Sequence, residues 1–122
     1  MGYRSDVAAV FYVTDKQKLP EIKLWLTENF PVEEFDSCVR WFTNGMVFEC
    51  DDVKWYDTYP DVEAFNTAVE KFVDMFCKGD KEKFEGAYEF IRIGEEYEDV
   101  EVIREGDYDY LLEFNRSIGT TV

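Results

Sequence analysis

Apolar residues at alternating positions predict that the chain opens with a buried strand. Residues 1–13 become increasingly apolar after Arg4 and Asp6, which stand at the strand entrance. Successive side chains of a strand point to opposite faces, so Arg4 and Asp6 share one side. The other side of the strand carries Val7, Ala9, Phe11 and Val13.

Two later segments carry apolar residues at helical spacing. The first covers 19–30, and the second covers 59–80. We expect the second helix to start near Thr58 and to end with Gly79 as its C-terminal cap. Asp61 would lie in the first turn, where the positive end of the helix dipole stabilises a carboxylate. Both stripes indicate helices that pack on a core. They consist of Leu19, Ile22, Leu26 and Phe30, and of Val62, Phe65, Val69, Phe72 and Phe76.

A hairpin is predicted over 38–50, where two β-rich runs flank Asn44-Gly45. This dipeptide accepts positive φ at both centres of a type I′ turn. A two-residue loop there gives an aromatic face and a charge-paired face, and it leaves Phe42 and Val47 as apolar residues on the second. The expected pairs are Thr43–Met46, Trp41–Phe48 and Val39–Cys50 on the first face, and Phe42–Val47 and Arg40–Glu49 on the second.

The remaining pattern predicts a strand over 87–94 and a C-terminal hairpin over 100–115, turning at Gly106-Asp107. The order β-α-β-β-α-β with a C-terminal β-hairpin extension matches the ferredoxin-like split β-α-β arrangement, an α+β fold in one domain over 1–122. Both helices would cover one sheet face. The other face could be covered by the hairpin, or this face or a sheet edge could form a homodimer, and the pattern leaves both open.

Charge changes this picture most, because the chain carries a net charge of −15 with no histidine. Such a chain repels nucleic acid and anionic membranes, so we expect no direct contact with either. A basic host protein is the partner that the charge suits, although the charge could simply keep the chain dispersed.

The excess acid is concentrated in 80–109, which holds twelve acidic and four basic residues. Mimicry of nucleic-acid phosphates would explain this clustering, and chance placement on solvent-facing positions is the alternative. We predict that a partner binds this segment, while the aromatic stretch 53–62 is the competing contact surface. The predicted partner-binding residues are Glu89, Glu95, Glu96, Glu98, Asp99, Glu101, Glu105, Asp107 and Asp109.

Catalytic chemistry finds little support in the sequence. The chain lacks histidine, the commonest general base near neutral pH, and it contains no GxGxxG, Walker A or GxSxG motif. Asp51-Asp52 and the acids of 94–101 do not match a metal-loop pattern, so we predict no metal and no cofactor. We therefore expect a protein that is not an enzyme. A carboxylate-based hydrolase, a small-ligand-binding module and a homo-oligomeric ferredoxin-like module are the alternatives.

Arg4 and Asp6 also suggest a charge cluster at the sheet end. If the strand at 87–94 lies beside the first strand, Arg92 can join them. Such a cluster could bind an anion, but a satisfied network of ion pairs is the favoured interpretation. We therefore predict a structural charge cluster of Arg4, Asp6 and Arg92.

The three cysteines predict reduced thiols. Cys38, Cys50 and Cys77 show no CxxC spacing, and no apolar signal-peptide core precedes them. No apolar run approaches the roughly 20 residues that cross a bilayer. We expect a soluble protein in a reducing cytosol.

Three segments resemble those of small uncharacterised acidic bacteriophage proteins with a GYRSDV-like N-terminus. They are GYRSDV (2–7), KWYDTYPDV (54–62) and IRIGEEYEDVE (91–101). The resemblance implies a phage origin and action in the host bacterial cytoplasm. By analogy with other small acidic phage proteins, it suggests an inhibitor of host defence, such as an anti-restriction protein, an anti-CRISPR protein or a DNA mimic, but it transfers no site residues.

Overall fold

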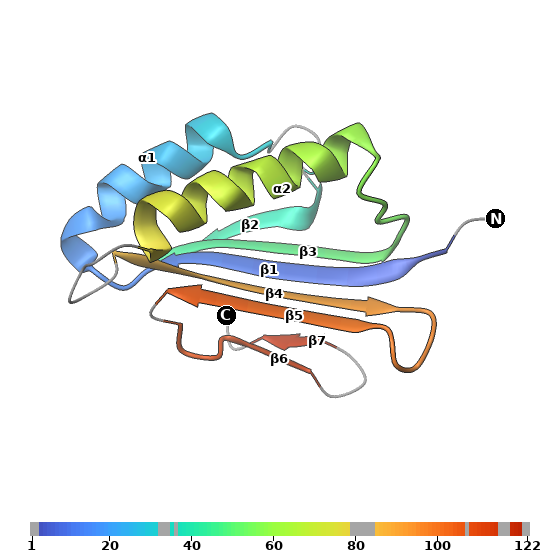
Figure 1. Cartoon of the computed structure of the whole chain (residues 1–122). Helices are drawn as coiled ribbons and strands as arrows, with labels where there is room; N and C mark the ends of the chain where they lie inside the picture. The colour runs from blue at the N-terminus through green and yellow to red at the C-terminus, as the bar shows by residue number, and fades with distance from the viewer. Residues whose placement is uncertain are drawn as a thin grey trace.

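Five antiparallel strands form one sheet, and both helices lie on the same face of it (Figure 1). The computed structural model describes residues 3–31, 35, 37–78, 85–106, 108–114 and 118–120. A two-stranded ribbon lies on the opposite side of the sheet (Figure 1). The fold is therefore mixed α+β, with three layers.

The strands of the large sheet follow the order β2-β3-β1-β4-β5. They are β1 (Ser5–Val13), β2 (Val39–Phe42), β3 (Gly45–Val53), β4 (Gly86–Gly94) and β5 (Val100–Gly106). The ribbon pairs β6 (Leu112–Phe114) with β7 (Ile118–Thr120). The helical segments are the 3-10 turn η1 (Lys16–Lys18), α1 (Leu19–Asn29), α2 (Pro60–Phe72) and the π-helical turn η3 (Val73–Cys77).

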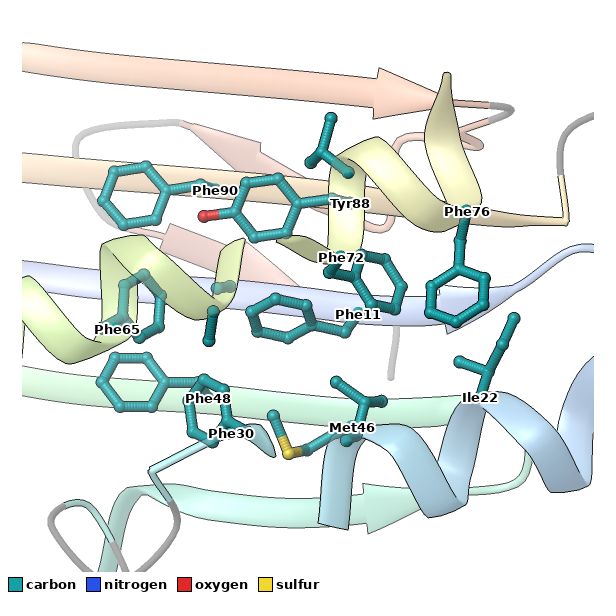
Figure 2. Packing of buried hydrophobic residues seen from close by; sticks show 14 of the residues in the cluster. Phe11, Ile22, Phe30, Met46, Phe48, Phe65, Phe72, Phe76, Tyr88 and Phe90 are labelled. Atoms are coloured by element: carbon teal, nitrogen blue, oxygen red, sulfur yellow. The ribbon is translucent and has the colours of Figure 1, made fainter. Parts of the chain in front are cut away.

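The two helical stripes and the odd-numbered side of β1 meet in one aromatic core. Phe11 is fully buried at its centre, with ring centroids 5.3 Å from Phe30, 5.2 Å from Phe72 and 4.9 Å from Tyr88 (Figure 2). The contacts with Phe30 and Phe72 are edge-on, a favoured geometry for aromatic rings, and the contact with Tyr88 is tilted. The prediction that both helices cover one face of the sheet is thus confirmed. Gly79, the predicted cap, lies outside the described residues.

The opposite sheet face is covered within the chain. Val47 is fully buried there in a cluster with Leu112, and Phe42 and Ile118 pack against the same cluster. Of the two arrangements that the sequence left open, the structure has the C-terminal ribbon as the cover. A homodimer would have to use another surface.

The predicted hairpin over 100–115 was wrong. Residues 100–106 pair with β4, as in the pair Ile91 and Val102, and the ribbon is formed further along by β6 and β7. The chain reverses at 95–99, an acidic turn that carries no strong turn dipeptide. Gly106 does adopt a positive φ of 78°, but it ends β5 there, and Asp107 lies outside the described residues.

The register of the β2–β3 hairpin differs by two residues from the prediction. Trp41 pairs with Met46 and Phe42 with Gly45, so Thr43 and Asn44 form the loop. Neither Asn44 nor Gly45 has a positive φ, and the type I′ turn was therefore wrong. Gly45 is needed for another reason, because a Cβ there would collide with the backbone carbonyl of Phe11 in the neighbouring strand.

Two of the three cysteines are joined, which corrects the prediction of reduced thiols. A disulfide links Cys38 to Cys50, with their Cα atoms 5.5 Å apart, and Cys77 is free and buried. The bond ties the residue just before β2 to the middle of β3, two sites 12 positions apart in the sequence. Among the described residues, no helix is long and apolar enough to cross a membrane.

Candidate functional site

The turn between β4 and β5 presents the most exposed acidic surface of the predicted binding segment. Glu95, Glu96 and Glu98 are all exposed there. Tyr97 stands among them with 75% of its surface accessible. The turn thus combines three carboxylates with one large aromatic side chain, a residue type that often anchors protein interfaces.

Backbone hydrogen bonds within the turn define its shape. The amide of Gly94 donates to the carbonyl of Asp99 at 2.8 Å, and the amide of Asp99 donates to the carbonyl of Glu96 at 3.0 Å. The amide of Val100 also donates to the carbonyl of Glu98 at 3.0 Å. These bonds give the acidic residues a set geometry before any partner binds.

Tyr3, which precedes β1, clamps the turn from a distant part of the sequence. Its hydroxyl donates to Oδ2 of Asp99 at 2.6 Å and accepts from the amide of Glu96 at 3.0 Å. The backbone amide of Tyr3 donates to the hydroxyl of Tyr56 at 2.6 Å. The hydrogen bond to Asp99 raises the pKa of Tyr3, because ionisation of the hydroxyl would remove the donated proton and place a second negative charge beside the carboxylate.

Arg92 holds the turn from the other side. Its guanidinium donates to both carboxylate oxygens of Asp99, at 2.7 and 3.1 Å, and to Glu101 at 3.3 Å. The hydrogen bonds from Arg92, and then from Tyr3, lower the pKa of Asp99 to about 2. Asp99 is therefore engaged in holding the turn, and the exposed Glu101 pairs with Arg92 across β4 and β5.

The predicted charge cluster of Arg4, Asp6 and Arg92 is divided between two places. Asp6 accepts a hydrogen bond from the amide of Asp52 at 2.9 Å, and Arg4 donates to the carbonyl of Asp52 at 2.8 Å. These contacts support the positive φ of Asp52, 54°, where the β1–β3 register shifts. Arg92 aligns with Val7 on the helical side and binds Asp99, so the expectation of one joint cluster was wrong.

Glu89 is not available to a partner, which corrects its place among the binding residues. It is fully buried and accepts hydrogen bonds from the hydroxyl of Tyr12 at 2.6 Å, the amide of Leu111 at 2.8 Å, the amide of Leu112 at 3.3 Å and Nε of Arg104 at 3.3 Å. Burial, and then the bond to Glu89, raises the pKa of Tyr12. Glu89 therefore docks the C-terminal segment onto the sheet.

The other predicted acids are distributed along β5 and beyond it. Glu105 is half-buried and lines a groove that has α2 and η3 on one side and β5 on the other. Asp109 is exposed, and its amide donates to the hydroxyl of Tyr12 at 2.6 Å. Asp107 lies outside the described residues. The nine predicted residues thus do not form one surface, and the exposed turn is the part that could act as one.

Sequence reasoning missed the residues that position the turn and the C-terminal segment, namely Tyr3, Tyr12 and Arg104. One local signal was present, because Glu89 interrupts the apolar run AYEFI with a charge that must find partners if the strand is buried. Those partners come from residues up to 77 positions away in the sequence, which no local pattern reveals.

The described residues contain no group of three or more histidine, cysteine or acidic side chains arranged to hold a metal ion.

In comparisons with known proteins, no family model, no curated protein and no solved structure matches this chain. The acidic turn is therefore the feature of the molecule from which a function can be proposed.

Proposed function

We propose that this protein is a non-enzymatic binding protein whose acidic turn, residues 95–99, contacts a basic surface on a partner protein. The observation that carries the proposal is the exposure of Glu95, Glu96 and Glu98 around Tyr97 on a turn held by Tyr3. No described basic side chain forms an ion pair with Glu96 or Glu98. Their charge is thus directed to solvent, where a cationic partner can meet it.

Two physical effects support this role. A turn that is already ordered loses little conformational entropy on binding, which favours affinity. The net charge of −15 attracts a basic partner over distances beyond contact and speeds the encounter, an effect that weakens as salt rises.

The identity of the partner is proposed from charge and resemblance together. We infer a host bacterial protein that handles nucleic acid, such as a restriction or CRISPR defence factor, because such proteins expose basic surfaces for phosphates. The turn and its neighbouring acids would occupy that surface by nucleic-acid mimicry, in the cytoplasm of an infected cell. For the fold, we propose a ferredoxin-like unit extended by β5 and the ribbon, which the order β2-β3-β1-β4 supports.

Capture from lysate of host bacteria tests the proposal. The tagged protein is compared with a turn variant, Glu96→Lys/Glu98→Lys, and with a control variant, Glu28→Lys/Glu63→Lys, whose acids are exposed on the helices. Both variants change the net charge equally. We expect a basic protein to be retained at low salt by the wild type and the control and to be lost by the turn variant.

The captured protein is then purified, and its affinity is measured by calorimetry over a salt series and in competition with DNA or RNA. Competition by nucleic acid would support mimicry. Equal loss of binding in both variants would mean that net charge alone acts, and recovery of no specific partner at low salt would contradict the proposed function.

A further inference from the structure

The strand β5 forms an edge of the large sheet. Among the described residues it pairs with β4 and with no other strand. Its seven residues, 100–106, thus leave one row of backbone groups without a strand partner. Such an edge can accept an extended peptide as an additional strand.

A groove with a volume of about 380 Å³ runs beside this edge on the helical side of the sheet. Apolar side chains of Val69, Val73 and Ile103 line it, and Ile103 is 36% exposed. Three carboxylates also line the groove, against one lysine whose Nζ lies 3.9 Å from Asp74. These charged residues are Glu70, Asp74, Glu105 and Lys78.

The hydroxyl of Tyr88 is a second, independent feature of the groove. Tyr88 lines it and is only 1% exposed, with its ring packed beside Phe11 and Phe90 (Figure 2). Within the described part of the chain, this hydroxyl makes no hydrogen bond. No described side chain has a buried polar atom without a partner, so this hydroxyl meets solvent at the groove, where a donor or acceptor that enters can hydrogen-bond to it.

We propose that β5 binds an extended basic segment of the partner as an added strand, with a lysine or arginine side chain seated in this groove. The aliphatic stem of that side chain would contact Val69, Val73 and Ile103, as long basic side chains do on apolar surfaces. Its cation would lie among the carboxylates and donate to the hydroxyl of Tyr88. The inference rests on the proposed function and specifies how the basic partner is held.

The charges on β5 have a competing explanation. Charged side chains such as Glu101 and Glu105 on an edge strand prevent unwanted pairing between sheets. In that case the edge would bind no peptide, and the hydroxyl of Tyr88 would contribute nothing to binding. The two explanations give opposite results with a defined peptide.

The probe is a fluorescent, end-capped peptide of alternating lysine and valine, equal in length to β5, and binding is followed by anisotropy. We expect saturable binding, with amide chemical-shift changes in 100–106. Tyr88→Phe should weaken binding about tenfold, the effect of losing a hydrogen bond to a charged group. Glu105→Gln should also weaken it, whereas Glu63→Gln, an exposed acid near the start of α2, should not.

A peptide with the same sequence but N-methylated at alternate residues keeps its charge and cannot pair with a strand. Equal binding of both peptides, unchanged affinity in Tyr88→Phe and Glu105→Gln, or no saturable binding would each overturn the inference. The proposed function is tested separately by the turn variant. Loss of the captured partner in Glu96→Lys/Glu98→Lys but not in Tyr88→Phe would leave the acidic turn as the site and remove β5 from it.

Discussion

Replacing Glu89 with alanine tests how the C-terminal segment is held on the sheet. Glu89 accepts four hydrogen bonds, from Tyr12, Arg104, Leu111 and Leu112, and it is fully buried. Glu89→Ala would leave all four donors without this acceptor. Two of these donors are backbone amides at the start of the C-terminal segment, so the substitution acts directly on its docking.

The expected cost follows from the burial of the pair. Removing one partner of a buried ion pair costs about 3–5 kcal/mol, because the other charge remains without compensation. The side chain of Arg104 is 22% exposed, so water can partly solvate it, and we expect the lower end of this range, about 3 kcal/mol. That loss is a large share of the roughly 5–15 kcal/mol that holds a typical domain.

Urea denaturation and amide hydrogen exchange measure the two parts of this prediction. We expect Glu89→Ala to lower the free energy of unfolding and to speed exchange in 108–114 and 118–120 more than in β4. The control is Glu49→Ala, which removes an exposed ion pair at 3.0 Å from Arg40 and should cost no more than about 1 kcal/mol. If Glu89→Ala cost as little as the control, or left exchange unchanged, the docking role of Glu89 would be refuted.

Three further predictions follow from the disulfide, the buried thiol and the acidic turn. Reduction, or Cys38→Ser/Cys50→Ser, should lower the free energy of unfolding by up to about 3 kcal/mol in urea denaturation, and identical midpoints with and without reductant would contradict this. Burial raises the pKa of Cys77 from 9.0 to about 12, so the free energy of unfolding should fall as pH rises from 9.0 towards 12. Alkylation of this thiol should also be far slower in the native protein than in urea, and equal rates would exclude a buried thiol. The pKa of Asp99 is lowered from 3.8 to about 2, so the stability that Asp99 contributes should be present above pH 3.8 and should be lost as pH falls towards 2. Asp99→Asn should therefore flatten the acid side of the curve of unfolding free energy against pH. An unchanged curve would show that Asp99 does not stabilise the turn.

Periodicity along the chain was enough to predict which sides of both helices and of the β2–β3 hairpin face the core. Helical spacing placed the stripe that includes Ile22 and Leu26 and the stripe that includes Phe65 and Phe72 on buried faces, and the structure buries them. The faces of the β2–β3 hairpin were also predicted correctly although its register was not. The reason is that a shift of two residues in one strand keeps every side chain on its own side of the sheet.

The register, the disulfide and the site depend instead on contacts between distant segments of the chain. The register depends on Gly45, which must approach the backbone of Phe11 closely, and the disulfide depends on the pairing of β2 with β3. The acidic turn owes its shape to Tyr3, which binds Asp99 across 96 positions of sequence. Local patterns report the burial of a face, because burial repeats with the period of the element. The partner of a polar group has no such period, since it is set by how distant segments pack.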